Sequence, residues 1–197
     1  VNLKKFINTK LPIEDPKSFL MASRIIREKG VIEYLEAVKQ IKLKYPNTVF
    51  KLAGSIDNND KNVINRTELL RLCEISGVLY LGHIADIKSE LNNSHCVILP
   101  SYYNEGCPKI LLEAAAMGRI IITTDWPGCR DTVNNGKNGY LCEPKSAKSL
   151  AEKIQEFLSL SINEMEQMSE MSRAHAKKFF DVKIINDLYL EKILLSY

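Results

Sequence analysis

Short apolar segments alternate with longer amphipathic segments along most of this chain, and this alternation constrains its fold more than any other feature. The apolar segments cover residues 18–23, 48–54, 78–82, 96–101, 119–125 and 139–144. Their near-continuous apolar character is typical of strands that are covered on both faces. Because strands that alternate with helices form βαβ units, we predict an α/β fold with a parallel sheet of about six strands and helices on both faces.

Composition and charge argue against several classes of function. Lys and Arg total 27 against 24 Asp and Glu in 197 residues, and a net charge of +3 is too small to indicate a nucleic-acid partner. The five cysteines are odd in number and contain no C-x-x-C pair, which is typical of a reducing compartment rather than of disulfides or zinc. No apolar run reaches the roughly 20 residues of a transmembrane segment. No Asp-x-Asp or His/Cys cluster indicates a metal.

Two glutamates eight positions apart, Glu105 and Glu113, are the strongest chemical signal. Glu105 follows the fourth apolar segment on a loop marked by Gly106 and Pro108, and Pro108 suits the first turn of a helix. Glu113 lies about a turn and a half inside that helix. Its neighbours are apolar nearly all round, so we expect it to be buried with a partner. Two carboxylates at the carboxyl end of a parallel strand, beside a helix N-terminus, suit a polyhydroxy ligand that carries phosphate.

A second signal follows the first apolar segment. Arg24 and Lys29 flank a short turn that leads into a helix at Gly30. The planar Arg fork and the compact Lys charge both suit phosphate oxygens. Taken alone, these cations are more simply interpreted as solvated charges at a helix start. Their position at a strand end, with Glu105 and Glu113 at another strand end, favours a shared ligand site.

The two signals together resemble the C-terminal, nucleotide-sugar-binding domain of GT-B glycosyltransferases of the large retaining group called family 4, or glycosyl transferases group 1. This domain is Rossmann-like and forms one half of the GT-B fold. In that family an R-x4-K-G turn meets the donor diphosphate, and an E-x7-E motif meets the donor sugar and ribose. The matching residues are Arg24, Lys29 and Gly30 for the first motif and Glu105 and Glu113 for the second. The stretch 127–144 also looks like the family's segment after strand five, whereas Ser23 stands where the family more often has Gly.

The resemblance implies a role for each matching residue. Arg24 and Lys29 would stabilise the departing diphosphate in place of a metal ion, so that no cofactor is expected. Glu105 would accept hydrogen bonds from donor-sugar hydroxyls close to the anomeric centre, and Glu113 would accept both ribose hydroxyls. The catalytic set is therefore Glu105, Arg24 and Lys29. Further contacts to the donor are expected from the helix N-terminus and from the main chain after strand three, at Gly106, Cys107, Lys109, His83 and Ile84.

The implied function is transfer of a sugar from a nucleoside-diphospho-sugar with retention of configuration. The stretch 126–133 resembles members that transfer N-acetylhexosamine-type sugars to lipid-linked acceptors, which favours UDP. We expect a saccharide or lipid-linked acceptor, a role in capsule or lipopolysaccharide assembly, and a cytoplasmic enzyme at the inner membrane face. Two alternatives stay open. One is a nucleotide-sugar 2-epimerase of the same fold, for which no acid/base set is found, and the other is a nucleotide-binding module without turnover.

The resemblance also divides the chain. Residues 1–17 would form the start or linker, residues 18–180 the nucleotide-sugar-binding domain, and residues 181–197 a helix that crosses to an N-terminal acceptor domain. Because the chain opens without Met, we expect an excised piece that is inactive without that domain. Crossing implies exposed apolar side chains on the last helix, at Ile184, Leu188 and Leu194.

Two further segments carry expectations. The loop 57–65 is the most polar of the chain, and we expect it simply to face solvent. Tyr102, Tyr103 and Asn104 directly precede Glu105, and we expect them to shape the sugar or acceptor side of the site.

Overall fold

The computed structural model describes residues 1–12, 15–57 and 59–194. Six strands form one sheet in the order β3-β2-β1-β4-β5-β6, and every neighbouring pair is parallel. The strands are β1 (Ser18–Ala22), β2 (Val49–Ala53), β3 (Leu79–Gly82), β4 (Cys96–Leu99), β5 (Ile120–Thr124) and β6 (Gly139–Cys142). The predicted α/β fold with a Rossmann-like sheet is confirmed. Because the chain leaves the β1–β4 pair in opposite directions, the topological switch point lies between the carboxyl ends of these two strands.

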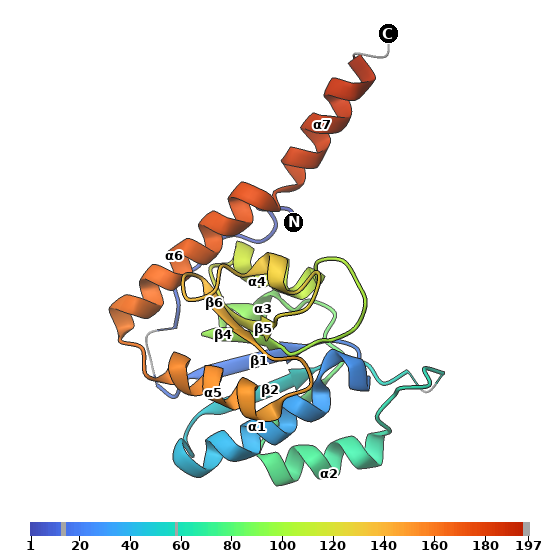
Figure 1. Ribbon diagram of the computed structural model, residues 1–197, viewed down its shortest axis with the longest axis vertical. Coiled ribbons are helices and arrows are strands. Elements are labelled where there is room, and N and C mark those ends of the chain that lie inside the picture. The colour runs from blue at the N-terminus through green and yellow to red at the C-terminus, as the bar shows by residue number, and fades with distance from the viewer. Residues whose placement is uncertain (13–14, 58, 195–197) are drawn as a thin grey trace.

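Helices cover both faces of the sheet (Figure 1). On one face α1 (Val31–Lys44) packs against α2 (Arg66–Ser76) and α5 (Ala147–Leu158). On the other face α4 (Lys109–Ala116) packs against α6 (Ile162–Phe179). The short α3 (Lys88–Asn92) connects β3 to β4, and α7 (Val182–Leu194) ends the described chain. Two short 3-10 turns, η1 (Arg27–Lys29) and η2 (Arg130–Thr132), precede α1 and follow β5.

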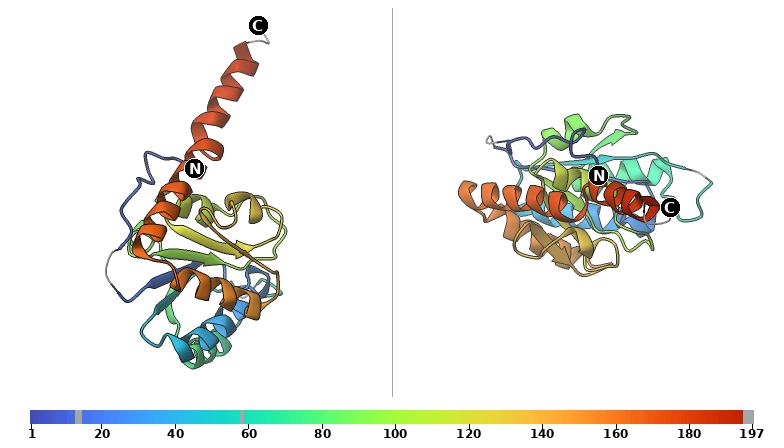
Figure 2. Two further views of the ribbon diagram at one scale, coloured as in Figure 1. Left: turned by 60° about the vertical axis from the view of Figure 1, so that its left-hand side comes forward. Right: turned by 90° about the horizontal axis from the view of Figure 1, so that it is seen from above.

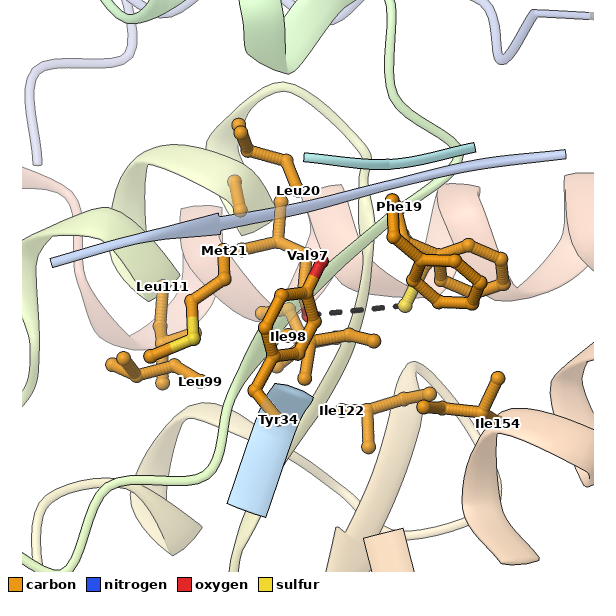
Figure 3. Packing of buried hydrophobic residues seen from close by; sticks show 14 of the residues in the cluster. Phe19, Leu20, Met21, Tyr34, Val97, Ile98, Leu99, Leu111, Ile122 and Ile154 are labelled. Carbon is orange, nitrogen blue, oxygen red and sulfur yellow. Dashed lines mark hydrogen bonds between the residues drawn. The ribbon is translucent and has the colours of Figure 1, made fainter. Parts of the chain in front are cut away.

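Aromatic side chains fill the space between the sheet and the helices on the α1 and α5 face. Phe19 of β1 stacks on Phe50 of β2 with ring centroids 4.5 Å apart, and it meets the edge of Phe157 at 5.1 Å. Tyr34 of α1 is fully buried among them, and its hydroxyl donates to the carbonyl of Lys51 at 3.0 Å. Figure 3 shows Phe19 and Tyr34 among apolar side chains of β1, β4 and β5. This packing joins β1 and β2 to the helices that cover this face of the sheet.

The second long helix, α2, begins with a side-chain cap. Asn65 accepts a hydrogen bond from the Glu68 amide at 2.9 Å, so it caps the helix and α2 begins at Arg66. The preceding polar residues therefore stay in the loop after β2. In this loop Ile64 is fully buried, which the expected solvent-facing loop 57–65 does not account for.

The amino edge of the sheet is held by two buried polar side chains. The Ser18 amide donates to Nδ1 of His95 at 3.0 Å, which joins the starts of β1 and β4. Arg119, which precedes β5, is fully buried and carries no carboxylate partner among the described residues. Its guanidinium instead donates to backbone carbonyls from three segments, at Thr9, Lys10, Asn92, Ser94 and Met117. The N-terminal segment is thereby tied to the edge of the sheet opposite the switch point.

The N-terminal segment runs beside α6 and the start of α7. Arg173 of α6 donates to the carbonyl of Phe6 at 2.8 Å, and the Val182 amide donates to the carbonyl of Val1 at 3.0 Å. Figures 1 and 2 show α7 extending beyond the rest of the molecule from this point. None of the helices within the described ranges has the length and hydropathy of a membrane span.

The last helix carries apolar side chains with few neighbours. Val182 is 39% exposed and Leu190 is 58% exposed, whereas Ile184 is half-buried. The side chains of Leu188 and Leu194 lie outside the described residues. Whether this helix meets another domain stays a prediction.

We predict that acid destabilises the fold through His95. Burial, with Lys17 and Arg119 nearby, lowers the pKa of His95 from 6.5 to about 4. Between these values the unfolded chain binds a proton that the folded chain excludes, so the free energy of unfolding falls as pH drops from 6.5 towards 4. Urea denaturation at several pH values between 6.5 and 4 measures this decrease in the free energy of unfolding. His95→Asn keeps an acceptor for Ser18 but cannot titrate, and it should give a flatter profile; an unchanged slope in this variant would contradict the assignment to His95.

Candidate functional site

The turn between β1 and α1 lies directly against the end of β4. Gly30 has a φ of 76°, a left-handed conformation, and a Cβ placed on it would lie 2.1 Å from the carbonyl oxygen of Pro100. Only glycine fits both conditions, because other residues lose energy at positive φ and would overlap this carbonyl. The amide of Tyr102 also donates to the carbonyl of Glu28 at 2.9 Å. These contacts bring the turn that bears Lys29 onto the loop that bears Glu105.

Lys29 and Glu105 form an ion pair across the switch point. Lys29 is only 7% exposed, and its Nζ contacts Oε1 of Glu105. A buried ammonium needs a charged partner to offset its desolvation, and Glu105 provides one from another strand end. The predicted proximity of the two motifs is thus observed for this pair.

Arg24 lies beside the same pair but has a different partner. Its Nη1 contacts Oδ2 of Asp60 at 3.2 Å, and its guanidinium lies 5.2 Å from the ring centre of Tyr103. Asp60 belongs to the loop 57–65, so the expectation that this loop only faces solvent is wrong. The loop runs back along the β1–α1 turn, since the Arg27 amide donates to the carbonyl of Asn62 at 3.0 Å. Polar composition alone gave no signal for this path.

The segment after β5 supports the Glu105 loop from the other side. Gly128 has a φ of 81°, and a Cβ there would lie 2.6 Å from the carbonyl oxygen of Glu105 and 2.5 Å from that of Gly106. The hydroxyl of Thr124 donates to the carbonyl of Ser101. The stretch 127–144, which carries part of the family resemblance, therefore begins by setting the backbone position of Glu105.

A pocket of about 230 Å³ lies at the carboxyl edge of β1, β2 and β3. Its lining combines apolar side chains with a few polar groups, at Ala22, Ser23, Arg24, Ala53, Gly54, Ser55, His83, Ile84, Ile87 and Ile110. Three residues expected at the site, Arg24, His83 and Ile84, thus meet in one pocket. Its size and mixed lining suit a small ring with polar edges.

The N-terminus of α4 faces the same edge of the sheet. Pro108 is its N-cap, and no side chain among the described residues caps the first turn. Gly106 and Lys109 are exposed, and Cys107 is half-buried. Burial raises the pKa of the Cys107 thiol, so it stays protonated near pH 7. The free amides and the helix dipole make this end of α4 favourable for an anion.

Glu113 is buried, as expected, but it lines a second hollow. Its side chain lies 3.7 Å from Nζ of Lys109, and burial raises its pKa while Lys109 opposes that shift. This hollow of about 310 Å³ lies under the N-terminal segment and includes Val1, Lys5 and Phe6. Glu113 stands three positions after Ile110, which lines the first pocket, so the two hollows adjoin along one helix. The structure thus places Glu105 in contact with Lys29, whereas Glu113 lies in the second hollow.

The arrangement combines two cations, a helix N-terminus and two carboxylates at one sheet edge. Such a set can bind a doubly charged anion at its centre and hydroxyl donors on either side. Within the described ranges, no group of three or more His, Cys, Asp or Glu residues is arranged to hold a metal ion.

Comparison with known proteins identifies the family of this chain. The family model "Glycosyl transferases group 1" matches residues 4–175. The chain belongs to this family. It is 32% identical over 203 residues to an N,N'-diacetylbacillosaminyl-diphospho-undecaprenol alpha-1,3-N-acetylgalactosaminyltransferase of Campylobacter jejuni, an alignment that covers 97% of this chain and 51% of that protein.

Solved structures show the same fold. The C-terminal domain of a group 1 glycosyl transferase, LpcC of Francisella tularensis, aligns with a TM-score of 0.79 and 23% identity over 92% of this chain and 99% of that domain. The pneumococcal O-GlcNAc transferase GtfA, in complex with UDP and GlcNAc, aligns with a TM-score of 0.77 and 24% identity over 90% of this chain and 35% of that protein. The chain spans between about a third and a half of the length of the curated relatives that it matches, according to the sequence alignments.

We predict that Gly30 is required for the site to assemble. Gly30→Ala adds backbone strain and a clash with Pro100, and should lower the free energy of unfolding by about 3 kcal/mol. Gly136 has nearly the same φ, 77°, but open space around its Cβ position, so Gly136→Ala should cost only about 1 kcal/mol. Chemical denaturation of both variants measures the difference, and equal losses would show that the contact with Pro100 is unimportant.

Proposed function

We propose that this chain is the donor-binding half of a glycosyltransferase and holds a nucleoside-diphospho-sugar between the carboxyl ends of β1 and β4. One observation carries the proposal: Arg24 and Lys29 from one strand end and Glu105 from the other converge beside a ring-sized pocket and the N-terminus of α4. A diphosphate at this point would meet two cations and free backbone amides.

The two cations would also stabilise the leaving group during sugar transfer. Negative charge develops on the departing diphosphate, and Arg24 and Lys29 are fixed where they can stabilise it without a metal ion. Glu105 lies on the Lys29 side, so it would face the sugar attached to the second phosphate. The diphosphate would replace Glu105 as a partner of Lys29, which frees this carboxylate to accept hydrogen bonds from sugar hydroxyls.

The nucleoside would occupy the pocket next to Arg24. His83 and Ile84 after β3 would contact the base, and Ile110 would pack against it from α4. Glu113, one turn further along α4, would accept the ribose hydroxyls. Burial raises the pKa of Glu113 because it removes water from the charged carboxylate. Hydrogen bonds from the ribose hydroxyls would replace those lost to water and favour the charged form.

The comparisons support a finer assignment of the donor. A UDP complex of the same fold and a relative named for N-acetylgalactosamine transfer favour a UDP-linked N-acetylhexosamine. The relative's name also gives an alpha-1,3 linkage, which retention would produce from an α-linked donor. The acceptor in its name, N,N'-diacetylbacillosaminyl-diphospho-undecaprenol, favours a lipid-linked sugar as acceptor in the assembly of a surface polysaccharide.

The acceptor would bind on a domain that corresponds to the half of the longer relatives that this chain does not match. The exposed apolar positions of α7, Val182 and Leu190, would contact that domain. Sugar transfer would then need both the donor-binding domain and the acceptor-binding domain. This chain by itself would bind the donor without transferring the sugar.

We predict that UDP and UDP-N-acetylglucosamine stabilise this chain. A ligand that binds only the folded state at a hundred times its Kd adds about 2.7 kcal/mol, or roughly 5–10 °C in Tm for a domain of this size. A thermal-shift panel of UDP-, GDP- and ADP-sugars measures this directly. One nucleotide class should stand out, and no shift with any of them would refute a donor site.

We further predict opposite effects from the two members of the ion pair. Lys29→Met removes a charged donor to the diphosphate and should weaken UDP binding roughly 10- to 100-fold. Glu105→Gln leaves Lys29 without its carboxylate, so the free protein should be less stable while UDP binds as tightly as before or tighter. Titration calorimetry with UDP measures both affinities.

A matched control is available in the ion pair between Lys51 and Glu90. Their atoms lie 2.8 Å apart, both side chains are mostly buried, and neither residue lines the pocket. Lys51→Met should lower stability without changing UDP affinity. Equal weakening by Lys29→Met and Glu105→Gln would argue against a diphosphate at Lys29.

A further inference from the structure

Tyr103 contacts both cations of the site. Its ring centre lies 4.8 Å from Nζ of Lys29 and 5.2 Å from the guanidinium carbon of Arg24. Both distances are within the range of cation–π attraction, in which a cation faces the electron-rich surface of an aromatic ring. Lys29 and Arg24 carry like charges, so a shared ring between them offsets part of their repulsion.

The backbone of Tyr103 is held in place by the elements that carry the site. Its amide donates to the hydroxyl of Ser101 at 3.2 Å, and the hydroxyl of Ser101 in turn donates to the carbonyl of Glu28 at 3.3 Å. Glu28 immediately precedes Lys29 in η1. The backbone that carries the ring is therefore tied to the turn that presents one of the two cations.

Each cation also contacts a carboxylate of its own. Arg24 contacts Asp60 in the loop after β2, and Lys29 contacts Glu105 in the loop after β4. The two carboxylates thus come from different loops, whereas the ring of Tyr103 contacts both cations.

We propose that Tyr103 is the positioning residue that keeps Arg24 and Lys29 together for the diphosphate, an inference that rests on the proposed function. The ring holds both side chains beside the switch point, where the two phosphates would lie. Its aromatic face performs this role, and its hydroxyl is not needed. This role differs from the expected shaping of the sugar or acceptor side.

The adjacent tyrosine provides a matched comparison. The ring of Tyr102 lies 5.0 Å from Nζ of Lys145, in the loop after β6, and contacts neither Arg24 nor Lys29 in the same manner. Tyr102 and Tyr103 are both half-buried and are neighbours in one loop. A general loss of loop structure would therefore affect both tyrosine variants alike.

The test measures binding of UDP and of uridine to the 197-residue chain by calorimetry. Tyr103→Leu should weaken UDP binding roughly tenfold, in line with the loss of two cation–π contacts, and leave uridine binding unchanged. Tyr103→Phe should bind UDP within about twofold of the original chain, and Tyr102→Leu should do the same. In an Arg24→Ala background the effect of Tyr103→Leu should shrink, because the two residues act together. Tyr103→Met repeats the test if the Leu variant does not fold.

The other outcomes separate the positioning role of Tyr103 from the proposed donor site. Unchanged UDP affinity in Tyr103→Leu, with normal binding by the original chain, overturns the positioning role alone. A tenfold loss in Tyr103→Phe assigns the effect to the hydroxyl, and an equal loss for uridine assigns it to nucleoside contact; both contradict the inference. Absence of UDP binding by the original chain overturns the proposed function and this inference with it.

Discussion

The contact between Gly30 and Pro100 is the constraint on which the rest of the site depends. It joins the turn after β1 to the end of β4 with backbone against backbone, at the point where the direction of the sheet reverses. A side chain at Gly30 would separate these segments. Lys29 would then lose Glu105, and Tyr103 would move away from the two cations. The chemistry of the site thus depends on an approach that only glycine permits.

Polar side chains have a structural role at the amino edge of the sheet and form the candidate site at the carboxyl edge. At the amino edge, His95 and Arg119 are buried and use their polar atoms to join strand starts and the N-terminal segment. At the carboxyl edge, Lys29 is buried, but its partner Glu105 and the neighbouring Arg24 stay partly accessible. Ion pairs satisfy both cations within the protein, so a diphosphate bound as proposed would replace one set of partners by another.

Much of the site could be predicted because both motifs follow strands directly. Parallel strands bring their carboxyl ends to one edge, so Arg24, Lys29 and Glu105 had to lie near each other once the sheet was recognised. Asp60 and Tyr103 could not be assigned in the same manner. Asp60 reaches Arg24 only through the path of a polar loop, and Tyr103 meets the two cations only through the course of the loop after β4, where its backbone amide donates to Ser101. Neither loop carries a periodic pattern from which its course can be inferred.

The sequence by itself determined the alternation of strands and helices, the parallel sheet and the strand ends at which the charged motifs lie, because hydrophobic periodicity and turn residues act locally. The family follows from those motifs and their order. Only the tertiary structure decided which carboxylate meets which cation, that Glu113 adjoins the first pocket rather than lining it, and that Tyr103 faces both cations. These outcomes depend on distances of a few ångströms between segments far apart in the chain, and packing of the whole domain sets such distances.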